Sequence, residues 1–295
     1  MPDPDRSLIR PWPMGAGAAR PAEEFIMKHA WKTVIASAAI VAFGTTAQAD
    51  QLQEIKDEGK IVVGVKQDYK PWGYLTSDGE LAGLEIDLAR DVAERLGVEV
   101  ELVPVVASNR MEFLSQGRID LIIATMGDNP KRREVVGMIE PNYYAGGTNV
   151  LAPKAVGLKE WEDLRGKDVC ALQGSYYNKR VTQLYGPNLV AFAGIPEVTS
   201  ALKNGSCIGF LYDNTWIESQ LASDEQWAEF EMPFPTEDPQ AWSIAVPLEE
   251  LDAPYGKLMS EIVTDWHKSG FLIERNEANG IAPSPFLQEQ HDALQ

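Results

Sequence analysis

The sequence is poor in the residue types on which most metal sites and nucleophilic enzymes depend. Its 295 residues include three histidines, His29, His267 and His291, and two cysteines, Cys170 and Cys207. Zinc clusters need several such ligands close together, and a Ser-His-Asp triad needs a histidine beside its nucleophile. The composition therefore nearly excludes both kinds of site, and we expect neither a metal ion nor another cofactor.

Positive charge is scarce as well. The chain has 44 Asp and Glu residues against 26 Lys and Arg residues, a formal net charge of −18 and a pI near 4.6. Binding to a phosphate backbone needs a surplus of Lys and Arg, so nucleic acid is disfavoured as a partner. The hydrophobic fraction of 44%, with 9% aromatic residues, is ordinary for a folded globular chain with a sizeable core.

The only long apolar run lies within residues 33–43, and it is too short to span a bilayer comfortably. Lys28 and Lys32 precede it, and Ala47-Gln48-Ala49 follows. A positive segment, a short apolar segment and an A-x-A site together predict a secretory signal peptide that is cleaved after Ala49. We therefore expect the mature protein to be exported from the cytoplasm.

Residues 1–26 have no role in this interpretation. Met27 would be the natural start of the signal peptide, and the proline-containing stretch before it is either an over-extended start or a disordered tail. Export of residues 50–295 would leave 40 acidic against 21 basic residues, so the mature chain would be still more acidic. Export also permits a disulfide, which an even pair of cysteines fits.

From Asp50 onward, short β-branched runs alternate with amphipathic stretches, which indicates an α/β architecture with mainly parallel sheets. The first half predicts strands at Ile61–Val65, Val98–Val105 and Asp120–Ala124, and helices at Leu84–Leu96 and about Asn109–Gln116. The second half predicts strands at Val169–Gln173, Leu189–Phe192 and Ile208–Tyr212, and helices near Tyr176–Tyr185 and Glu197–Asn204. Each half therefore has the pattern of one βαβαβ unit.

The two halves also match in position. Gly59-Lys60 before the first strand corresponds to Gly166-Lys167 before the fourth, an offset that pairs Asp68 with Ser175 and Tyr69 with Tyr176. In doubly wound sheets a ligand lies beyond the carboxyl ends of the strands. Polar and aromatic residues gather at those ends: Asp68, Tyr69, Trp72, Thr125, Ser175, Tyr176 and Asp213. If the two lobes face each other, these residues line one cleft; the alternative is that each group caps loops and helices in its own lobe.

Two stretches could join the lobes. Residues 146–153 lead from the first to the second, and residues 241–247 follow an acidic, proline-rich segment and could lead back. A chain that crosses twice gives a hinge between rigid lobes. We therefore expect a first lobe at residues 50–148, a second lobe at 149–240 and a return to the first lobe at 241–295, where a helix from Pro254 to Lys268 packs. Tyr143 and Tyr144 are better interpreted as hinge packing than as ligand contacts.

Cys170 and Cys207 lie near the starts of the fourth and last expected strands. Those two strands are usually neighbours in a doubly wound unit. We predict a Cys170–Cys207 disulfide across the second lobe, with two buried thiols as the alternative.

Several segments, taken in order, resemble the periplasmic polar amino-acid-binding proteins of ABC importers, which are family 3 bacterial extracellular solute-binding proteins. They are Gly59–Val65, Tyr69–Trp72, Gly83–Leu88, Gly117–Ile122, Asn129–Arg132, Leu164–Lys167 and Trp266–Gly270. The resemblance covers about residues 51–285. It implies a two-lobed periplasmic binding protein fold, with two doubly wound sheets joined by a two-crossing hinge. It also implies a monomer that captures a small amino acid and docks on an inner-membrane ABC permease.

The resemblance implies roles for particular residues. Arg132 matches the arginine that binds the ligand carboxylate, and a guanidinium suits that geometry. Asp213 matches the aspartate that binds the ammonium group. The full set of expected ligand-binding residues is Asp68, Tyr69, Trp72, Arg110, Thr125, Gly127, Arg132, Ser175, Tyr176 and Asp213. Alternatives remain: Arg132 could belong to a solvated charge run with Lys131 and Arg133, and the aromatic wall of Tyr69 and Trp72 could be plain core.

Arg110 resembles a second arginine that is found in members that take acidic amino acids or their amides, so such a ligand is favoured. Two departures complicate the choice. Position 68 is Asp where some acidic-ligand binders have a basic residue, and Asp128 lies in an unusual run before Arg132. These carboxylates would repel an anionic side chain unless they point away or pair with Arg110, so a ligand with an amine is also open.

Two other functions compete with transport. Resembling folds host periplasmic dehydratases, but no histidine of the usual acid-base kind is available near the cleft. The candidate carboxylates Asp68, Asp87 and Asp213 all have binding or structural interpretations. A ligand sensor that presents its closed form to a receptor is the third possibility. We therefore expect a binding protein and not an enzyme.

Overall fold

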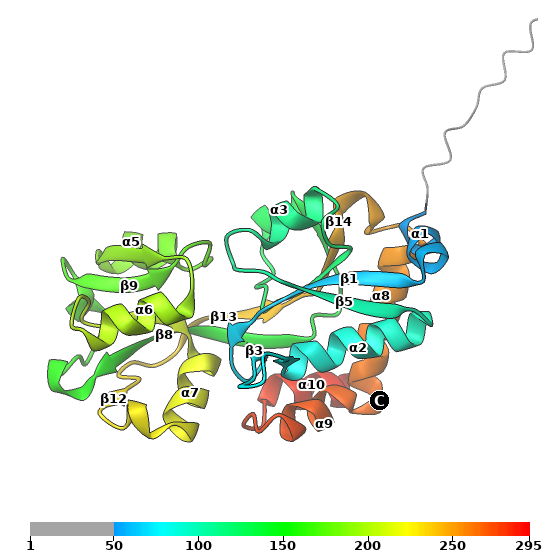
Figure 1. The fold of residues 1–295 in the computed structure, drawn as a ribbon. Coiled ribbons are helices and arrows are strands. Elements are labelled where there is room, and N and C mark those ends of the chain that lie inside the picture. Colours follow the sequence, from blue (N-terminus) through cyan, green and yellow to red (C-terminus); the bar gives the residue numbers. More distant parts are fainter. Residues whose placement is uncertain (1–49) are drawn as a thin grey trace, which may run out of the picture. The chain divides into compact units, whose positions relative to one another are not determined.

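A computed structural model describes residues 50–295, so the expected signal peptide and upstream extension lie outside the described residues (Figure 1). Within residues 50–295, no helix combines the length and the apolar character needed to cross a membrane. The described chain is an α/β fold with two large sheets, which confirms the expected two-lobed architecture.

The first sheet has the strand order β5-β1-β6-β14-β7. Its strands are β1 (Lys60–Val65), β5 (Glu99–Pro104), β6 (Leu121–Ile123), β7 (Val136–Met138) and β14 (Ala245–Pro247). β1 pairs in parallel with both β5 and β6, whereas β14 returns from far along the chain and runs antiparallel to its neighbours. The three expected strands of the first half are therefore present, and each end lies within one residue of its predicted position.

Helices flank this sheet. They are α1 (Gln51–Glu58), α2 (Leu84–Leu96), α3 (Arg110–Ser115), α4 (Pro130–Arg133), α8 (Pro254–Ser269), α9 (Phe271–Ala278) and α10 (Pro285–Leu294). The apolar face of α2 is buried, and Gly97 ends the helix with a φ of 71°, as expected from the sequence. Trp266 of α8 donates its indole N–H to Asp91 of α2 over 2.6 Å. Helix α8, which corresponds to the helix expected from Pro254 to Lys268, therefore packs on the first lobe.

The second sheet has the order β10-β9-β11-β8-β12, with β13 paired to β8. Its strands are β8 (Tyr144–Pro153), β9 (Asp168–Leu172), β10 (Asn188–Phe192), β11 (Phe210–Asp213), β12 (Phe230–Glu231) and β13 (Glu237–Trp242). Helices α5 (Asn178–Tyr185), α6 (Ile195–Lys203) and α7 (Asn214–Ser223) complete the lobe. The central order β10-β9-β11 repeats β5-β1-β6 of the first sheet, in agreement with the matched halves of the sequence.

Two antiparallel strands, β8 and β13, join the lobes (Figure 1). Tyr144 of β8 pairs with Trp242 of β13, and farther along β8 the pairing partner becomes β11 of the second sheet. After β13 the chain passes through Ser243, whose N–H donates to Met126 O over 3.0 Å, and enters β14. Sheet membership thus assigns residues 60–138 and 245–247 to one lobe; the boundaries 148/149 and 240/241 stay a prediction.

An aromatic cluster lies where the two strands cross. The ring of Trp242 has its centre 5.2 Å from that of Tyr144, on which it stacks, and 6.5 Å from that of Tyr143. Trp72 and Tyr69 meet the same ring nearly edge-on at 5.9 and 6.2 Å. These buried contacts support the interpretation of Tyr143 and Tyr144 as hinge packing.

A small third sheet was not expected from the sequence. It consists of β2 (Asp68–Tyr69), β3 (Gly73–Leu75) and β4 (Leu81–Ala82), which follow β1 as a meander. Gly73 is required there, because a Cβ on this residue would come within 2.5 Å of the Lys66 carbonyl oxygen. The meander holds Asp68 and Tyr69 beyond the carboxyl end of β1.

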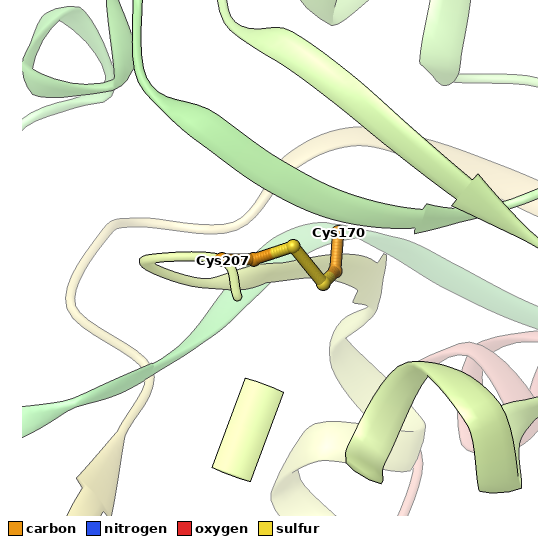
Figure 2. The surroundings of a disulfide bond; sticks show 2 residues. All are labelled: Cys170 and Cys207. Carbon is orange, nitrogen blue, oxygen red and sulfur yellow. A yellow bond between two sulfur atoms is a disulfide. The ribbon is translucent and has the colours of Figure 1, made fainter. Parts of the chain in front are cut away.

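The predicted disulfide is present (Figure 2). Cys170 lies in β9 and Cys207 just before β11, and their Cα atoms are 5.5 Å apart. β9 and β11 are parallel neighbours, with Cys170 opposite Phe210. Both cysteines are buried, and the bond closes the second lobe on itself without reaching the first.

Candidate functional site

A small cavity of about 20 Å³ lies between the strand ends of the two lobes. Its lining residues are Lys66, Ala107, Arg110, Thr125, Arg132, Ser175, Tyr176, Tyr177, Tyr212 and Asp213. Six of the ten residues predicted to bind ligand are among them. This volume is about that of one water site, so a molecule of amino-acid size enters only when the lobes separate or side chains move.

Arg132 is directed into this cavity although it belongs to a run of three basic residues. It is only 7% exposed, because α4 begins at an Asn129 cap that turns the arginine inward. Its guanidinium donates to Gly127 O over 2.6 Å and to Gly174 O of the second lobe over 3.1 Å. Burial and then the charge of Arg110 lower the pKa of Arg132 to about 9, which leaves it cationic at neutral pH.

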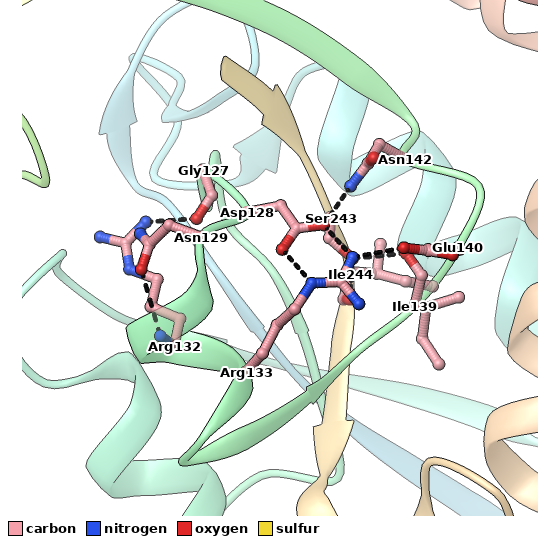
Figure 3. Close-up of polar contacts among 10 residues, drawn as sticks. All are labelled: Gly127, Asp128, Asn129, Arg132, Arg133, Ile139, Glu140, Asn142, Ser243 and Ile244. Carbon is pink, nitrogen blue, oxygen red and sulfur yellow. Dashed lines mark hydrogen bonds and ion pairs between the residues drawn. The ribbon is translucent and has the colours of Figure 1, made fainter.

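Arg133 points the other way (Figure 3). It donates to the Asp128 carboxylate over 2.7 and 2.5 Å and to Glu140 over 2.6 Å. Asn142 donates to the same Asp128 carboxylate over 2.9 Å. Asp128 is therefore neutralised by its neighbour outside the cavity, and the sequence-based concern that it would repel an anionic ligand is resolved.

Asp68 is also neutralised, but its partner is Lys66 and not Arg110. The two side chains form an ion pair of 2.9 Å, and Lys66 is only 2% exposed. The other carboxylate oxygen of Asp68 accepts the backbone N–H of Ile195 over 3.1 Å. Because Ile195 is the first residue of α6, Asp68 reaches across from the first lobe to the helix N-terminus of the second.

Arg110 is the first residue of α3 and is almost fully buried. It donates from Nη1 to the Ala124 carbonyl oxygen, and its Nε has no hydrogen-bond partner among the described residues. Burial lowers its pKa, while Glu85 and Asp213 act in the opposite direction. Arg110 is thus a buried cation at the cavity wall that has no ion-pair partner within residues 50–295.

Asp213 ends β11 and is 8% exposed. Burial raises the pKa of Asp213 to about 6, although a hydrogen bond from Tyr69 and the charges of Arg110 and Lys66 act to lower it. The Tyr69 hydroxyl donates to the Asp213 carboxylate over 3.0 Å. At neutral pH the carboxylate is therefore mainly ionised, and among the residues that the structure describes it is the only acidic side chain that lines the cavity.

Thr125 follows β6 in an unusual backbone conformation, with a φ of 46°. Its N–H donates to Glu85 Oε1 over 2.6 Å and to the Tyr143 hydroxyl over 3.2 Å. Residues other than glycine enter this region rarely, so two strong acceptors are needed to hold the loop. The arrangement places Thr125 at the cavity wall, as predicted from its position after a strand.

Four predicted residues do not line the cavity. Three of them contact a lining residue instead. Tyr69 donates a hydrogen bond to Asp213, and Asp68 forms an ion pair with Lys66. The carbonyl oxygen of Gly127 accepts a hydrogen bond from Arg132. Trp72 belongs to the aromatic cluster and faces a different hollow, so for this residue the packing alternative describes the geometry. Ser175 and Tyr176 do line the cavity, and Tyr176 donates its hydroxyl to Asp238 O over 3.1 Å.

Four lining residues were not predicted from the sequence: Lys66, Ala107, Tyr177 and Tyr212. Lys66 immediately follows β1, so the strand-end rule that selected Asp68 could have found it. Tyr212 precedes Asp213 at the end of β11, but alternation along a strand would have placed it on the opposite face. Tyr177 offers no separate signal beside Tyr176.

A larger hollow of about 580 Å³ lies between α7 and the α9–α10 connection. Its floor includes Trp72 and Tyr144, and its walls carry Glu218 and Glu277. Of the residues from Asp50 onward, no lysine, arginine or histidine lines it. An anionic group would have no cationic partner there, so the small cavity between the strand ends is the better candidate site. Residues 50–295 also show no cluster of three or more His, Cys, Asp or Glu side chains suited to a metal ion.

Comparisons with known proteins agree with this geometry. The chain is similar to the ABC transporter glutamine-binding protein of Bacillus subtilis, with 30% identity over 75% of this chain and 86% of that protein. It is also similar to the L-glutamate/L-aspartate-binding protein of Pseudomonas aeruginosa, with 24% identity over 89% and 87% of the two chains. The crystal structure of the solute receptor for L-cysteine of Neisseria gonorrhoeae matches with a TM-score of 0.73 and 25% identity, over 77% of this chain and 92% of that one.

The family-level match extends through both lobes. The model of the bacterial extracellular solute-binding proteins, family 3, matches residues 61–269, which include the lining residues and both crossing strands. This places the chain among binding proteins that act outside the cytoplasm, and not among enzymes. The chain therefore belongs to the bacterial extracellular solute-binding proteins, family 3.

Proposed function

We propose that the protein captures an amino acid with an acidic or amide side chain in the cavity between its lobes and delivers it to an ABC permease. One observation carries the proposal: Arg132 of the first lobe and Asp213 of the second are buried, oppositely charged and directed at the same cavity. An α-amino acid offers a carboxylate to the first and an ammonium group to the second. Contacts with both lobes favour the closed form, as uptake by lobe closure requires.

The remaining charges support the choice of side chain. Once Arg132 and Asp213 are assigned to the α-groups, Lys66 is paired with Asp68, and Arg110 is left as an additional cation in the wall. A buried cation without an ion partner favours a carboxylate, or a carbonyl oxygen as in an amide, over an amine. The names of relatives that bind glutamine, glutamate and aspartate are in keeping with this choice.

The partners follow from the same proposal. The ligand is a small amino acid, the receiving protein is an inner-membrane ABC permease, and the protein acts as a monomer in the periplasm after removal of residues 1–49. The closed form, in which both lobes present one continuous surface, is the species that docks on the permease.

The decisive experiment uses two adjacent arginines. Mature protein from Asp50, refolded to remove carried ligand, is screened by thermal shift against the proteinogenic amino acids. Because a ligand that binds only the folded state adds about 2.7 kcal/mol at a hundred times its Kd, a cognate ligand raises Tm by about 5–10 °C. Calorimetry then compares Arg132→Ala with Arg133→Ala.

We expect Arg132→Ala to abolish binding and Arg133→Ala to retain it, because the second arginine pairs with Asp128 outside the cavity (Figure 3). Both variants remove the same charge one residue apart, so a general charge effect would weaken binding equally. Retained affinity in Arg132→Ala would refute the site. A thermal response restricted to cationic amino acids would refute the acidic or amide choice while leaving the site in place.

A further inference from the structure

We propose that Glu85 is a positioning residue that sets the side-chain preference of the site: with its carboxylate ionised the cavity favours a neutral amide, and with the carboxylate protonated it favours an anionic side chain. The inference rests on the proposed function, because it concerns the charge that a bound amino acid meets at Arg110. Glu85 itself does not line the cavity and acts through its neighbours.

Glu85 is a charged residue in an unusual place. It lies in the first turn of α2 and is 0% exposed. Its Oε1 accepts the Thr125 N–H over 2.6 Å and the Tyr143 hydroxyl proton. One buried carboxylate thus joins the helix, the cavity loop and the segment that enters the crossing strand β8. A helix that only needed to pack would have an apolar residue here, as it has at Leu84 and Ile86.

The second carboxylate oxygen, Oε2, can take up a proton without breaking these hydrogen bonds. Oε2 has no hydrogen-bond partner among the described residues. The charged groups whose fields act on Glu85 are Arg110 from α3 and Lys66 from the end of β1, and both line the cavity. Lys66 is already paired with Asp68, so the charge of Glu85 bears mainly on Arg110.

The Glu85 carboxylate gains or loses its proton near neutral pH. Burial raises the pKa of Glu85 to about 7, although the hydrogen bonds from Tyr143 and Thr125 and the charges of Arg110 and Lys66 act to lower it. Above this pH the ionised Glu85 carboxylate offsets the positive charge of Arg110. Below it Glu85 is neutral, and the ligand meets the full positive charge of Arg110. Preference for an anionic side chain should therefore rise as the pH falls through about 7.

Asp213 also titrates, because burial raises its pKa to about 6. Its partner in the proposed site is the ammonium group, which every amino acid has, so its titration weakens all ligands alike. The ratio of two affinities removes this contribution, together with any general loss of stability. A ratio between ligands that differ only in side-chain charge is thus the measurement that isolates Glu85.

The experiment measures Kd for glutamate and glutamine by calorimetry between pH 6 and pH 8.5, with the weaker ligand measured by competition. It compares wild-type protein with Glu85→Gln and with the control Asp87→Asn. Gln keeps the oxygen that accepts the Thr125 N–H but cannot ionise. Asp87 lies two residues away in α2, is half-exposed and accepts from Asn279 over 3.0 Å, away from the cavity.

We expect the glutamate preference of the wild type to rise about tenfold from pH 8.5 to pH 6, as a unit charge several ångströms away in a partly buried site would produce. In Glu85→Gln the ratio of glutamate affinity to glutamine affinity should stay, at every pH, at the value that the wild type has at pH 6. In Asp87→Asn the ratio should change with pH as it does in the wild type. A second readout needs no variant: near pH 7, glutamate binding should take up more protons than glutamine binding, because an anion raises the pKa of Glu85.

The possible results distinguish the role of Glu85 from the proposed amino-acid-binding function. A ratio that does not change with pH in the wild type, or that changes equally in Glu85→Gln, overturns the role of Glu85 and leaves the proposed function intact. If the variant fails to fold, equal proton uptake for the two ligands in the wild type overturns it instead. Wild-type protein that binds neither ligand refutes the proposed side-chain class and this inference with it.

Discussion

The Tyr69 hydroxyl donates a hydrogen bond of 3.0 Å to the Asp213 carboxylate, although the two residues are 144 positions apart and belong to different lobes. The same hydroxyl lies 3.2 Å from Thr215 Oγ1. Burial raises the pKa of Asp213, and the tyrosine proton acts against this by stabilising the anion. Tyr69 therefore supports the proposed ammonium site through Asp213, and its role as a wall against the ligand stays a prediction.

Tyr69→Phe should weaken amino-acid binding about fivefold to tenfold. The variant keeps the ring in the aromatic cluster but removes one charge-assisted hydrogen bond, which contributes about 1.5–3 kcal/mol where it is made. Part of that loss is shared by the free protein, so the effect on Kd is smaller. Tyr144→Phe is the control, because its hydroxyl donates to Asn276 over 2.9 Å in the same cluster but away from the cavity. Equal affinities for the two variants in calorimetry would contradict the role of Tyr69.

The affinity for a ligand with a neutral side chain should be nearly constant between about pH 7 and pH 8 and fall at acidic pH. The pKa of Asp213 is raised to about 6 in the free protein, and the ligand ammonium group stabilises the ionised form. Binding therefore releases a proton below pH 6, and affinity should drop about tenfold per pH unit there. Calorimetry of a neutral ligand such as glutamine from pH 4.5 to 8 tests this. A flat profile would show that Asp213 does not face the ammonium group.

Asp213→Asn should abolish binding and yet not destabilise the protein at pH 7. The raised pKa of Asp213 means that the folded state holds the proton more tightly than the unfolded state does, so ionisation costs folding free energy above about pH 4. A neutral amide removes this cost, which is about 2–3 kcal/mol for a shift of this size. Thermal unfolding at pH 7 should give a Tm equal to or above that of the wild type. A large decrease would mean that the carboxylate is structurally required.

Much of the architecture could be predicted from the sequence because it depends on backbone periodicity. The helix at Leu84–Leu96 has the predicted bounds, since its apolar spacing and its terminal Gly97 act locally. The doubly wound pattern predicted that the fourth and last expected strands are neighbours, and β9, which holds Cys170, does lie beside β11, which follows Cys207. The meander β2-β3-β4 was missed, because strands of two or three residues leave no periodic signal.

The site was harder to predict because it depends on where side chains point. Adjacent arginines diverge at Arg132 and Arg133, and only the backbone of a four-residue helix decides which one faces the cavity. The sequence left open whether Asp68 points away from the site or pairs with Arg110, and it gave no sign of the partner that Asp68 has, which is Lys66 at the end of β1. Glu85 belongs to a segment that resembled the family, yet its link to Thr125 spans 40 residues and cannot be seen in the sequence.

Loss of the Cys170–Cys207 disulfide should lower stability without changing ligand affinity. The bond spans 37 residues of the second lobe, for which chain-entropy arguments give about 3–4 kcal/mol. For a chain of this size the loss corresponds to a decrease in Tm of about 6–16 °C. The double variant Cys170→Ser/Cys207→Ser is compared with the wild type by thermal unfolding and calorimetry. Weakened binding at a temperature where the variant is folded would mean that the bond also shapes the cavity.

Asp68 should act as a latch between the lobes. Its carboxylate accepts the Ile195 N–H at the start of α6, where the Gly194 cap has no side chain to do so. A helix cap contributes about 1 kcal/mol, and here the contribution exists only when the lobes are together. Removing it should favour the open form and weaken ligand binding about fivefold. The ion pair with Lys66 lies within the first lobe and should therefore affect open and closed forms equally.

Asp68→Ala tests the latch, since it removes the oxygen that accepts the Ile195 N–H, whereas an Asn would keep an acceptor there. Asp224→Ala is the matched control, because Asp224 accepts the Gln226 N–H over 3.0 Å within the second lobe alone. We expect only the first variant to raise Kd, and small-angle scattering of the ligand-free protein should show a larger radius of gyration for it. If both variants bind as the wild type does, the Asp68–Ile195 contact does not contribute to closure, and the charge pairs of Arg132 and Asp213 with the ligand must supply the free energy of closure.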